Sequence, residues 1–371
     1  MSKAQEFLAS SPSPHLHHGL DSVQRYWLLA LCLAFPVLQS ALFDRGYSLL
    51  IALFAIAGAL LAELPGTSHG RVSRLLNGSA LVQGLLFSLM LPASIALYIP
   101  FFSCFLSSLL VKYLLGGVSA SWLSVPLFAF LFARFAWPEA FEGGKTLSLL
   151  YQLEISHARY PHEGSVHPLD ILKMAGFKPS AMDASVTRFI NRHILRGLSA
   201  ELPFGYVDML FSRDPGAILA DRGCFALLLV SPIALAMRLS RFRTAVSFLV
   251  PYLILVFLFE PRLYGHASPL SIARLAPGGS GDVLFSLLTG GSVLCAVFLV
   301  QDSSLSGLSL LGSSLLAFLS ALIAFLLRQV LHIPYGMFHA LILLSLLAPP
   351  LRMLEWHLAR RLRAVRRRTA S

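Results

Sequence analysis

An acidic residue at the end of an apolar stretch is the first group in the sequence that could do chemistry. Asp302 ends a long apolar segment and is followed by two small polar residues, Ser303 and Ser304. Because ionisable groups inside a membrane are costly and usually functional, Asp302 could bind a cation or the edge of a flavin ring. A solvated helix end is the alternative interpretation, and both stay open.

Two glycine-containing pairs lie in the same part of the chain. Gly281-Asp282 and Gly290-Gly291 bracket a stretch of phenylalanine, leucine and serine. Glycine has no Cβ, so the backbone at these positions can closely approach a neighbouring helix or a planar ligand. The pattern predicts close packing or ligand contact there.

Histidine and cysteine do not occur at metal-ligand spacing. The cluster His15, His17 and His18 precedes the first apolar segment and is interpreted as a polar segment before the membrane. Three further histidines in a long polar region lack cysteine or carboxylate partners at ligand spacing, so no metal is expected. The cysteines lie apart in apolar stretches and are predicted to be small core residues: Cys32, Cys104, Cys224 and Cys295.

Charged residues also close several apolar segments. Glu63 ends one of them and is interpreted as an interfacial residue, whereas Lys112 and Arg134 are expected to extend toward the interface from span ends. Motifs of soluble enzymes are absent: the sequence has no GxGxxG after a strand, no P-loop, no HExxH and no GxSxG. Soluble nucleotide chemistry and serine hydrolysis therefore lose support.

The composition indicates which elements must position these residues. Of the 371 residues, 56% are hydrophobic and 13% are charged, and the mean hydropathy is +0.72. A soluble protein of this size cannot bury so many apolar residues, and disordered, coiled-coil and disulfide-rich chains have other compositions. The chain is therefore predicted to be an all-α integral membrane protein.

Ten apolar segments predict about ten transmembrane helices, because each is close to the ~20 residues that span a bilayer. They cover residues 26–43, 47–64, 79–95, 96–115, 121–137, 223–239, 244–259, 283–300, 307–327 and 335–351. Several contain proline, at Pro36, Pro92, Pro100, Pro126, Pro232 and Pro251. Irregular backbone within a membrane must be lined by protein or a cavity, so these interruptions favour a binding protein over a plain anchor.

The net charge of +11 indicates an orientation rather than a nucleic-acid partner. Seven of the 29 Lys and Arg residues follow Pro350, as in a cytoplasmic tail that faces anionic lipid. With the N-terminus inside, fourteen basic residues lie in short inner segments, and four lie in short outer loops: Arg45, Arg262, Arg274 and Arg328. We therefore expect both termini to be cytoplasmic.

One long polar region divides the spans five and five. The expected organisation is a cytoplasmic N-terminal segment, a first five-helix half, an outward loop, a second five-helix half and a basic tail. These parts cover residues 1–25, 26–137, 138–222, 223–351 and 352–371. The tetrapeptide Leu-Phe-Ser-Leu begins at Leu86 and again at Leu284, in the third segment of each half. This repeated tetrapeptide suggests the hypothesis of a 5+5 inverted repeat, with a binding site near the membrane midplane between the two halves.

Six segments along the chain carry a further signal: Ser13-Pro14-His15-Leu16, residues 77–92, Tyr206-Val207-Asp208, residues 281–291, Phe298-Leu299-Val300-Gln301-Asp302 and residues 334–349. In this order they resemble segments of the RnfD/NqrB family of membrane subunits of ion-translocating electron-transport complexes. The corresponding family segments are, in turn, the SPHI opening, DGSALVTGLLLALxLPP, the stretch entering the sixth span, GDPLFHLLSGG, FMATDP and the closing segment. The chain length is nearer to the shorter RnfD form.

The resemblance implies FMN joined through its phosphate to a threonine, in a D-x-x-S-G-A-T motif before the sixth span. The best match is Asp183-Ala184-Ser185-Val186-Thr187, so the implied attachment residue is Thr187, with Ser185 as the nearby alternative. The motif's glycine and alanine are missing, and the spacing from aspartate to threonine is two residues shorter. The other interpretation is that Ser185 and Thr187 cap or punctuate a helix through Phe189.

Two further family segments are altered. The family's GGLGxNxFNPA corresponds to residues 116–126, which contain no asparagine; the resemblance implies that this region helps to hold a second, noncovalent flavin. The PGSxGE stretch has become Pro215-Gly216-Ala217-Ile218, with Asp221 as the nearby acid. The predicted cofactor-binding residues are Asp183, Ser185, Thr187, Gly281, Gly290, Gly291 and Asp302.

The resemblance implies a flavin-carrying membrane subunit of an Rnf-type complex in the bacterial inner membrane, most similar to the RnfD form. Such a complex couples electron transfer between a low-potential donor and NAD(H) to Na⁺ or H⁺ transport. The implied partners are flavin and iron–sulfur subunits, and the chain is not catalytic alone. Two other functions stay open: a transporter or channel for a small solute, and a structural subunit without cofactor.

Overall fold

The chain is helical throughout the part that the structure describes. The computed structural model describes residues 21–64, 77–114, 123–142, 178–195, 202, 204–211, 217–263, 283–301, 309–331 and 333–369. No β-strand occurs among these residues, and a lone antiparallel bridge joins Pro92 and Ile218. The prediction of an all-α protein is confirmed for this part of the chain.

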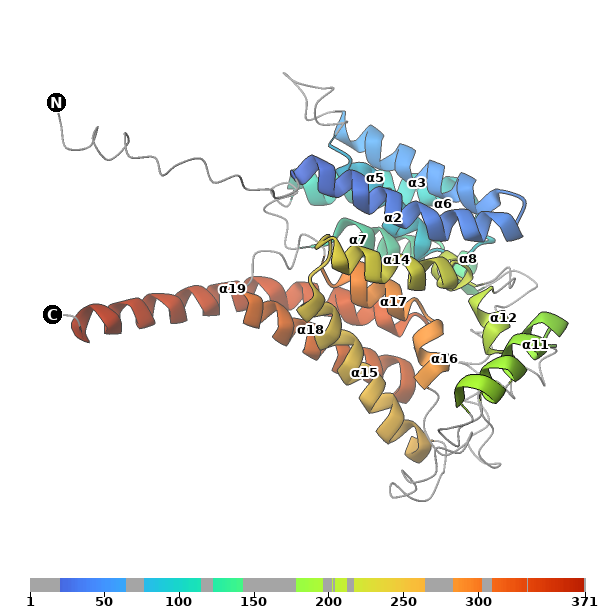
Figure 1. Ribbon diagram of the computed structural model, residues 1–371. Coiled ribbons are helices and arrows are strands. Elements are labelled where there is room, and N and C mark those ends of the chain that lie inside the picture. Colours follow the sequence, from blue (N-terminus) through green and yellow to red (C-terminus); the bar gives the residue numbers. More distant parts are fainter. Residues whose placement is uncertain are drawn as a thin grey trace, which may run out of the picture.

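The first five apolar segments form one group of helices (Figure 1). These are α2 (Ser22–Phe43), α3 (Tyr47–Glu63), α5 (Ser79–Leu89), α6 (Tyr98–Leu109) and α7 (Val125–Ala136). The π-helical turn η1 (Leu110–Leu114) extends α6. α3 packs on both α5 and α6. Two glycines permit this, since a Cβ at Gly84 would lie 2.7 Å from the Ile56 Cα and one at Gly58 would meet the Phe101 carbonyl.

Short helices occupy the described parts of the long polar region. They are α8 (Pro138–Glu142), α11 (Ala181–Ile190), η2 (Asn191–Leu195), α12 (Tyr206–Leu210) and α13 (Leu219–Arg222). In Figure 1, α11 and α12 lie at the side of the helix bundle, and α11 is the outermost of the two. The region is therefore helical where it is described.

The second group of apolar segments forms the other helices of the bundle. They are α14 (Cys224–Ala236), α15 (Phe242–Leu263), α16 (Val283–Leu288), α17 (Ser292–Leu294), η5 (Cys295–Leu299), α18 (Leu310–Phe325), η6 (Leu326–Val330) and α19 (Gly336–Thr369). α19 has 34 residues and contains Pro349 and Pro350. Its C-terminal part projects away from the bundle (Figure 1). The predicted boundary before residue 352 therefore falls inside one continuous helix.

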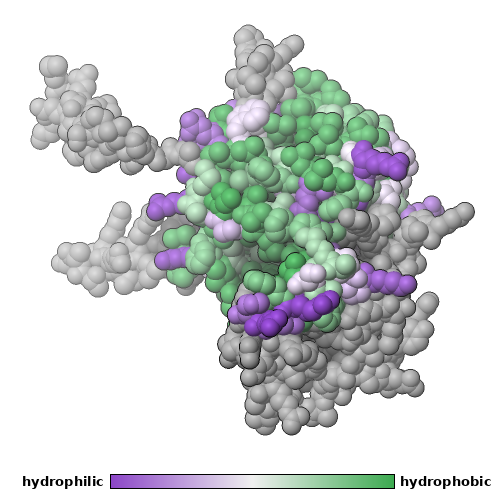
Figure 2. All heavy atoms as spheres, turned by 45° about the vertical axis from the view of Figure 1, so that its right-hand side comes forward, coloured by the Kyte–Doolittle hydropathy of each residue, from purple (hydrophilic) through white to green (hydrophobic). Residues whose placement is uncertain are grey.

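Apolar surface covers much of the bundle. Figure 2 shows a face on which the described residues are mainly hydrophobic, and large exposed side chains include Leu42 and Leu311. Four helical stretches are long and apolar enough to cross a membrane: Val23–Phe43, Phe242–Phe259, Leu310–Val330 and Gly336–His357. The shorter apolar helices are α3, α5, α7, α14 and the stretch Tyr98–Lys112. The structure thus supports a multi-pass membrane protein, and the number of ten spans stays a prediction.

The prolines interrupt the helices less than the sequence suggests. Pro36 and Pro232 lie inside α2 and α14, and Pro251 lies inside α15. A helix can continue through proline when neighbouring helices compensate for the missing donor. Of the six prolines named above, Pro92 alone lies in a break, between α5 and α6, whereas Pro100 and Pro126 lie in the first turns of α6 and α7. The four cysteines are free and buried, as predicted.

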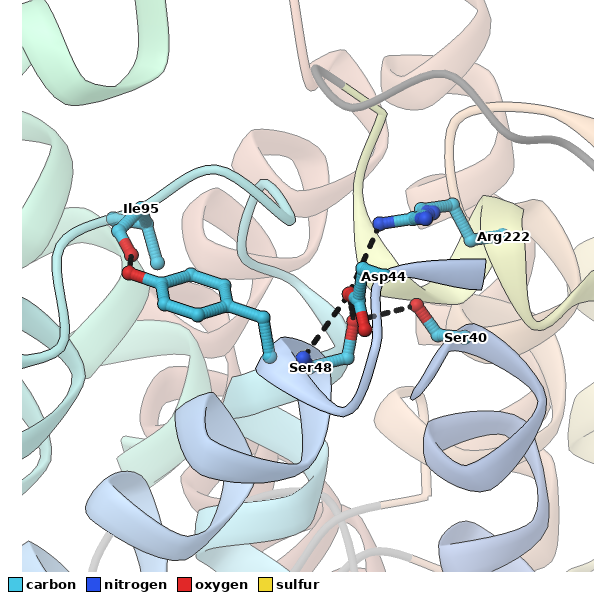
Figure 3. A network of polar contacts seen from close by, with 6 residues as sticks. Ser40, Asp44, Ser48, Ile95 and Arg222 are labelled. Carbon is cyan, nitrogen blue, oxygen red and sulfur yellow. Dashed lines mark hydrogen bonds and ion pairs between the residues drawn. The ribbon is translucent and has the colours of Figure 1, made fainter. Parts of the chain in front are cut away.

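A polar network anchors the first helical hairpin to the start of the second group (Figure 3). Asp44, in the turn between α2 and α3, accepts from the Ser48 backbone N–H at 3.0 Å and pairs with Arg222 at 3.1 Å. The Tyr47 hydroxyl donates to the Ile95 carbonyl at 2.8 Å. This network joins the α2–α3 turn to α13 and to the break after α5.

Replacing Gly84 with alanine is expected to destabilise the protein by about 1–3 kcal/mol, the usual cost of overpacking. The new methyl group would meet the Ile56 backbone, which cannot move without displacing α3 from α5. Denaturant unfolding of the purified protein in detergent measures the effect. Leu53→Ala, at a half-exposed position of α3, is the control and should change the midpoint less; equal midpoints for Gly84→Ala and the wild type would contradict the packing argument.

Candidate functional site

Helices α11 and α12 cap each other. Ser180 is the N-cap of α11, and its hydroxyl accepts from the Asp183 N–H at 3.1 Å. Asp208 of α12 accepts from the Ser180 backbone N–H at 2.6 Å and from the Ser180 hydroxyl at 2.7 Å. A carboxylate at a helix N-terminus satisfies free N–H groups and interacts favourably with the helix dipole.

Asp183 makes the reverse connection. It is fully buried, and its carboxylate accepts from the backbone N–H groups of Gly205 at 2.8 Å, Val207 at 2.9 Å and Asp208 at 3.3 Å. These groups lie at the start of α12, so Asp183 fixes the position of α11 on α12. The predicted motif aspartate therefore orients the helix that carries the predicted attachment residue.

Thr187 lies one helical turn after Asp183, on the same buried face of α11. Its side chain is 0% exposed, and its Oγ1 has no hydrogen-bond partner within the described part of the chain. Ser185 is exposed, and its hydroxyl donates to the Ala181 carbonyl at 2.9 Å. Both residues lie inside α11, which runs through Phe189 as the other interpretation expects, but the N-cap of this helix is Ser180 and not Ser185 or Thr187.

Asp183→Ala is expected to release α11 from α12, because it leaves three buried or partly buried N–H groups without their acceptor, at about 1–3 kcal/mol for each fully buried group. Hydrogen exchange by mass spectrometry should show faster exchange of the peptide that contains Gly205 and Val207, by about a hundredfold. Ser185→Ala should leave that exchange unchanged. Unchanged protection in Asp183→Ala would exclude the proposed orienting role.

Residues 217–222 form a junction between the two groups of helices. The Ala93 N–H donates to the Ala217 carbonyl at 3.1 Å, and the Leu219 N–H donates to the Leu91 carbonyl at 2.9 Å. The segment thereby satisfies backbone groups exposed by the break after α5. Three residues further on, Arg222 makes the ion pair with Asp44.

Asp221 of this junction binds a second break, between α16 and α17. Its carboxylate accepts from the N–H groups of Gly290 at 3.0 Å and Gly291 at 2.8 Å. Both glycines have φ of 67°, a conformation that disfavours other residues. A Cβ at either position would lie 2.8 Å from a neighbouring side chain, Arg328 or Phe338. The close approach predicted for these glycines is therefore made by protein side chains.

Arg328 fills the other side of the same break. Its guanidinium is buried and donates to the Tyr252 hydroxyl at 3.1 Å, to the Ser292 hydroxyl at 3.2 Å and to the Thr289 hydroxyl at 2.6 Å. It also donates to the carbonyls of Ser286 and Thr289, each at 3.2 Å. The expectation that Arg328 belongs to a short outer loop is wrong, since it lies in η6 and supports a helix break from inside the bundle.

A third polar cluster lies where α3 and α6 end. Lys112 donates to Glu63 Oε1 at 2.6 Å, and their side chains are 7% and 11% exposed. Lys112 therefore pairs with Glu63 and does not extend to an interface. Arg134 also turns inward, with its guanidinium 5.6 Å from the Phe141 ring and 5.4 Å from the Tyr335 ring.

The remaining predicted residues lie outside the described part of the chain. They are Gly281 and Asp302, together with the histidine cluster at residues 15–18. Among the residues that the structure describes, no group of three or more His, Cys, Asp and Glu side chains could hold a metal ion.

Sequence reasoning did not identify the partners of Asp44, Asp221 and Arg328. The signal for Asp221 was its place as the acid next to the altered PGSxGE stretch. Arg328 carried a signal as well, because it lies at the end of a long apolar segment. Their partners are distant in sequence, and no local spacing indicates them.

Comparison with known proteins matches nearly the whole chain to one family. The model of the NQR2, RnfD, RnfE family matches residues 9–357. No curated protein matches the chain.

Proposed function

The chain belongs to the NQR2, RnfD, RnfE family, and from this we propose that it is the flavin-carrying membrane subunit of an Rnf-type complex. The family consists of membrane subunits of ion-translocating electron-transport complexes. The proposed complex transfers electrons between a low-potential donor and NAD(H) and moves Na⁺ or H⁺ across the bacterial inner membrane. Its flavin and iron–sulfur subunits are the proposed partners, and RnfD is the proposed identity within the family.

The observation that carries the flavin proposal is the Thr187 hydroxyl, which has no hydrogen-bond partner among the described residues. A phosphoester needs a hydroxyl oxygen, and esterification of Thr187 Oγ1 would break no hydrogen bond with those residues. Asp183 would hold the helix that bears it. Bound FMN would supply the redox chemistry. The protein's own contribution would be to fix the position of α11 beside its neighbours in the complex.

The burial of Thr187 adds a condition to this proposal. Because the side chain is 0% exposed, α11 has to move away from its neighbours while FMN is attached. The same burial favours one alternative, a structural subunit without covalent flavin. Family membership, in turn, favours an electron-transport subunit over the small-solute transporter that proline-containing spans also fit.

A second, noncovalent flavin is proposed for the region that includes residues 116–126. Of this region, only residues 123–126 are described, and they enter α7. Ser124 is buried beside Val125 and Pro126. Gly290 and Gly291 contact protein side chains, which leaves residues 116–126 as the better place for this flavin.

The helix packing supports the proposed ten spans and 5+5 repeat. In the first half, the second and fourth helices, α3 and α6, pack closely; in the second half, α15 and α18 do the same. The first helices, α2 and α14, pack on each other, and the last helices, α7 and α19, are also in contact. Both third segments are broken, after α5 and after α16.

We place both termini in the cytoplasm, which sets the α2–α3 turn outside.

The function is tested in membrane vesicles from cells that carry the other subunits of the complex. Vesicles with the chain should couple oxidation of the low-potential donor by NAD⁺ to ion uptake. Vesicles without it should lose both activities. Electron transfer at an undiminished rate without the chain would contradict the proposal, and electron transfer without ion uptake in its presence would contradict the translocating role.

A further inference from the structure

The buried pair of Glu63 and Lys112 contains unused acceptor capacity. Lys112 and Ser79 both bind the same carboxylate oxygen, Oε1, at 2.6 and 3.4 Å. The other oxygen, Oε2, is buried and has no hydrogen-bond partner among the described residues. A buried carboxylate oxygen without a partner is costly, so this oxygen is a site where a cation would be favourable.

Further oxygens of the same kind lie one helical turn deeper in the bundle. Gln83 follows Ser79 by four residues on α5, and Ser108, near the end of α6, precedes Lys112 of η1 by four residues. Residues four apart share a helix face. Gln83 and Ser108 therefore lie on the same helix faces as Ser79 and Lys112, the two residues that bind Glu63. Gln83 is 7% exposed, and its Oε1 has no hydrogen-bond partner in the described part of the chain. Ser108 is 0% exposed, and its hydroxyl interacts as a donor with the Cys104 side chain, which does not use the acceptor capacity of its oxygen.

Two further serines of α6 are buried in the same way. Ser107 and Ser103 are also fully buried, and their hydroxyls are unpaired among the described residues. They lie on the face next to that of Ser108, one turn apart. Buried amide and hydroxyl oxygens therefore occur at successive turns of α5 and α6, starting from the carboxylate at the end of α3.

We propose that Glu63 Oε2, Gln83 Oε1 and Ser108 Oγ form a binding site for an alkali-metal cation. Oxygen ligands suit hard cations. One carboxylate and one ammonium cancel, so the site offers too little negative charge for a divalent ion in a low-dielectric interior. As a step in transport, the site rests on the proposed ion-translocating function; as a binding site, it stands without it.

Lys112 acts in this site as a built-in competitor. Its ammonium occupies the carboxylate of Glu63 and lowers the affinity for a second cation. Weak binding suits a path from which the ion must leave again. The two charged residues thus have opposite effects on cation binding, which distinguishes the site from a purely structural ion pair.

Binding of ²²Na⁺ to the purified chain in nanodiscs tests the proposal without electron transfer or flavin. The wild type is expected to bind ²²Na⁺ saturably, with Li⁺ as a competitor and choline without effect. Glu63→Gln should lose this binding. Lys112→Met should bind at least about tenfold more tightly, because a positive charge next to the site is removed.

Two variants separate binding from folding. Gln83→Leu keeps the ion pair and removes one proposed ligand, so it should weaken ²²Na⁺ binding severalfold while the protein stays folded by circular dichroism. Glu139→Gln, at an exposed acid of α8, is the matched control and should bind as the wild type does. Absence of saturable wild-type binding, or weaker binding in Lys112→Met together with normal binding in Gln83→Leu, would overturn the proposal. Loss of transport with intact ²²Na⁺ binding would instead contradict the proposed function.

Discussion

Thr187→Ala is expected to remove all flavin fluorescence that stays with the denatured chain. Only a hydroxyl can form the phosphoester, and Thr187 Oγ1 is the α11 hydroxyl that lacks a hydrogen-bond partner within the described residues. The measurement is in-gel fluorescence after denaturing electrophoresis, using protein made in a host that has the flavinylating enzyme. The expected change is from one flavin per chain to background.

Two neighbouring variants control for changes in folding. Ser185→Ala alters an exposed hydroxyl that is already bonded to its own helix, so it should keep wild-type fluorescence. Thr187→Ser keeps a hydroxyl and should keep part of the signal. Fluorescence that persists in Thr187→Ala, or disappears in Ser185→Ala, would move the attachment away from Thr187.

Arg328→Met is expected to destabilise the protein by about 3–5 kcal/mol, because each buried acceptor left without its donor costs about 1–3 kcal/mol. Five hydrogen bonds would be lost, four to residues around the break between α16 and α17 and one to Tyr252 of α15, and the hydroxyls of Thr289 and Ser292 would lose a charged donor. Unfolding of the purified protein in detergent, followed by circular dichroism, gives the value.

Arg243→Met is the control for this prediction. Arg243 is exposed on α15, so its loss should change the unfolding midpoint little. Asp221→Asn should also destabilise the protein, because it weakens the bonds to the Gly290 and Gly291 N–H groups on the opposite side of the same break. A wild-type midpoint for Arg328→Met would show that the break does not depend on the guanidinium.

Much of the fold could be predicted from the sequence, because apolar segments of about the length that spans a bilayer predict helices. Each of the ten apolar segments contains a described helix, and the buried cysteines were identified by their apolar neighbours. Proline was a poorer guide, since α2 and α14 continue through Pro36 and Pro232. Packing against neighbouring helices offsets the loss of the backbone hydrogen bond that proline cannot donate.

The polar junctions could not be predicted in this way. The prediction that Lys112 extends to an interface was wrong, because its partner Glu63 is far away in sequence. Arg328 was assigned to an outer loop for the same reason, since its partners come from α15 and from the break after α16. Long-range pairing of buried charges depends on how the helices meet, and a single sequence does not contain that information.

The resemblance identified α11 as the candidate flavin helix, but it did not predict how α11 packs. Nothing in the spacing of Asp183 and Thr187 indicates that the aspartate would cap another helix or that the threonine would be buried. The sequence does place both residues on one face of a helix, four positions apart, and the structure uses that face to pack α11 on α12.

The two proposed sites lie at opposite ends of the first hairpin. Gln39 near the end of α2 donates to the Leu210 carbonyl of α12, whereas Glu63 ends α3. The 17 residues of α3 separate these ends by about 25 Å, at ~1.5 Å per residue. Direct Coulomb interaction over that distance is weak, so coupling between a flavin on α11 and a cation at Glu63 has to pass through helix movement, with residues 217–222 as the connection between the halves.

The most direct test for a flavin on Thr187 is the mass of the tryptic peptide that ends at Arg188, isolated from native membranes of cells with the flavinylating enzyme. We predict a peptide heavier by one FMN less one water, with fragment ions that place the addition on Thr187. An unmodified peptide in full yield would contradict the proposed attachment.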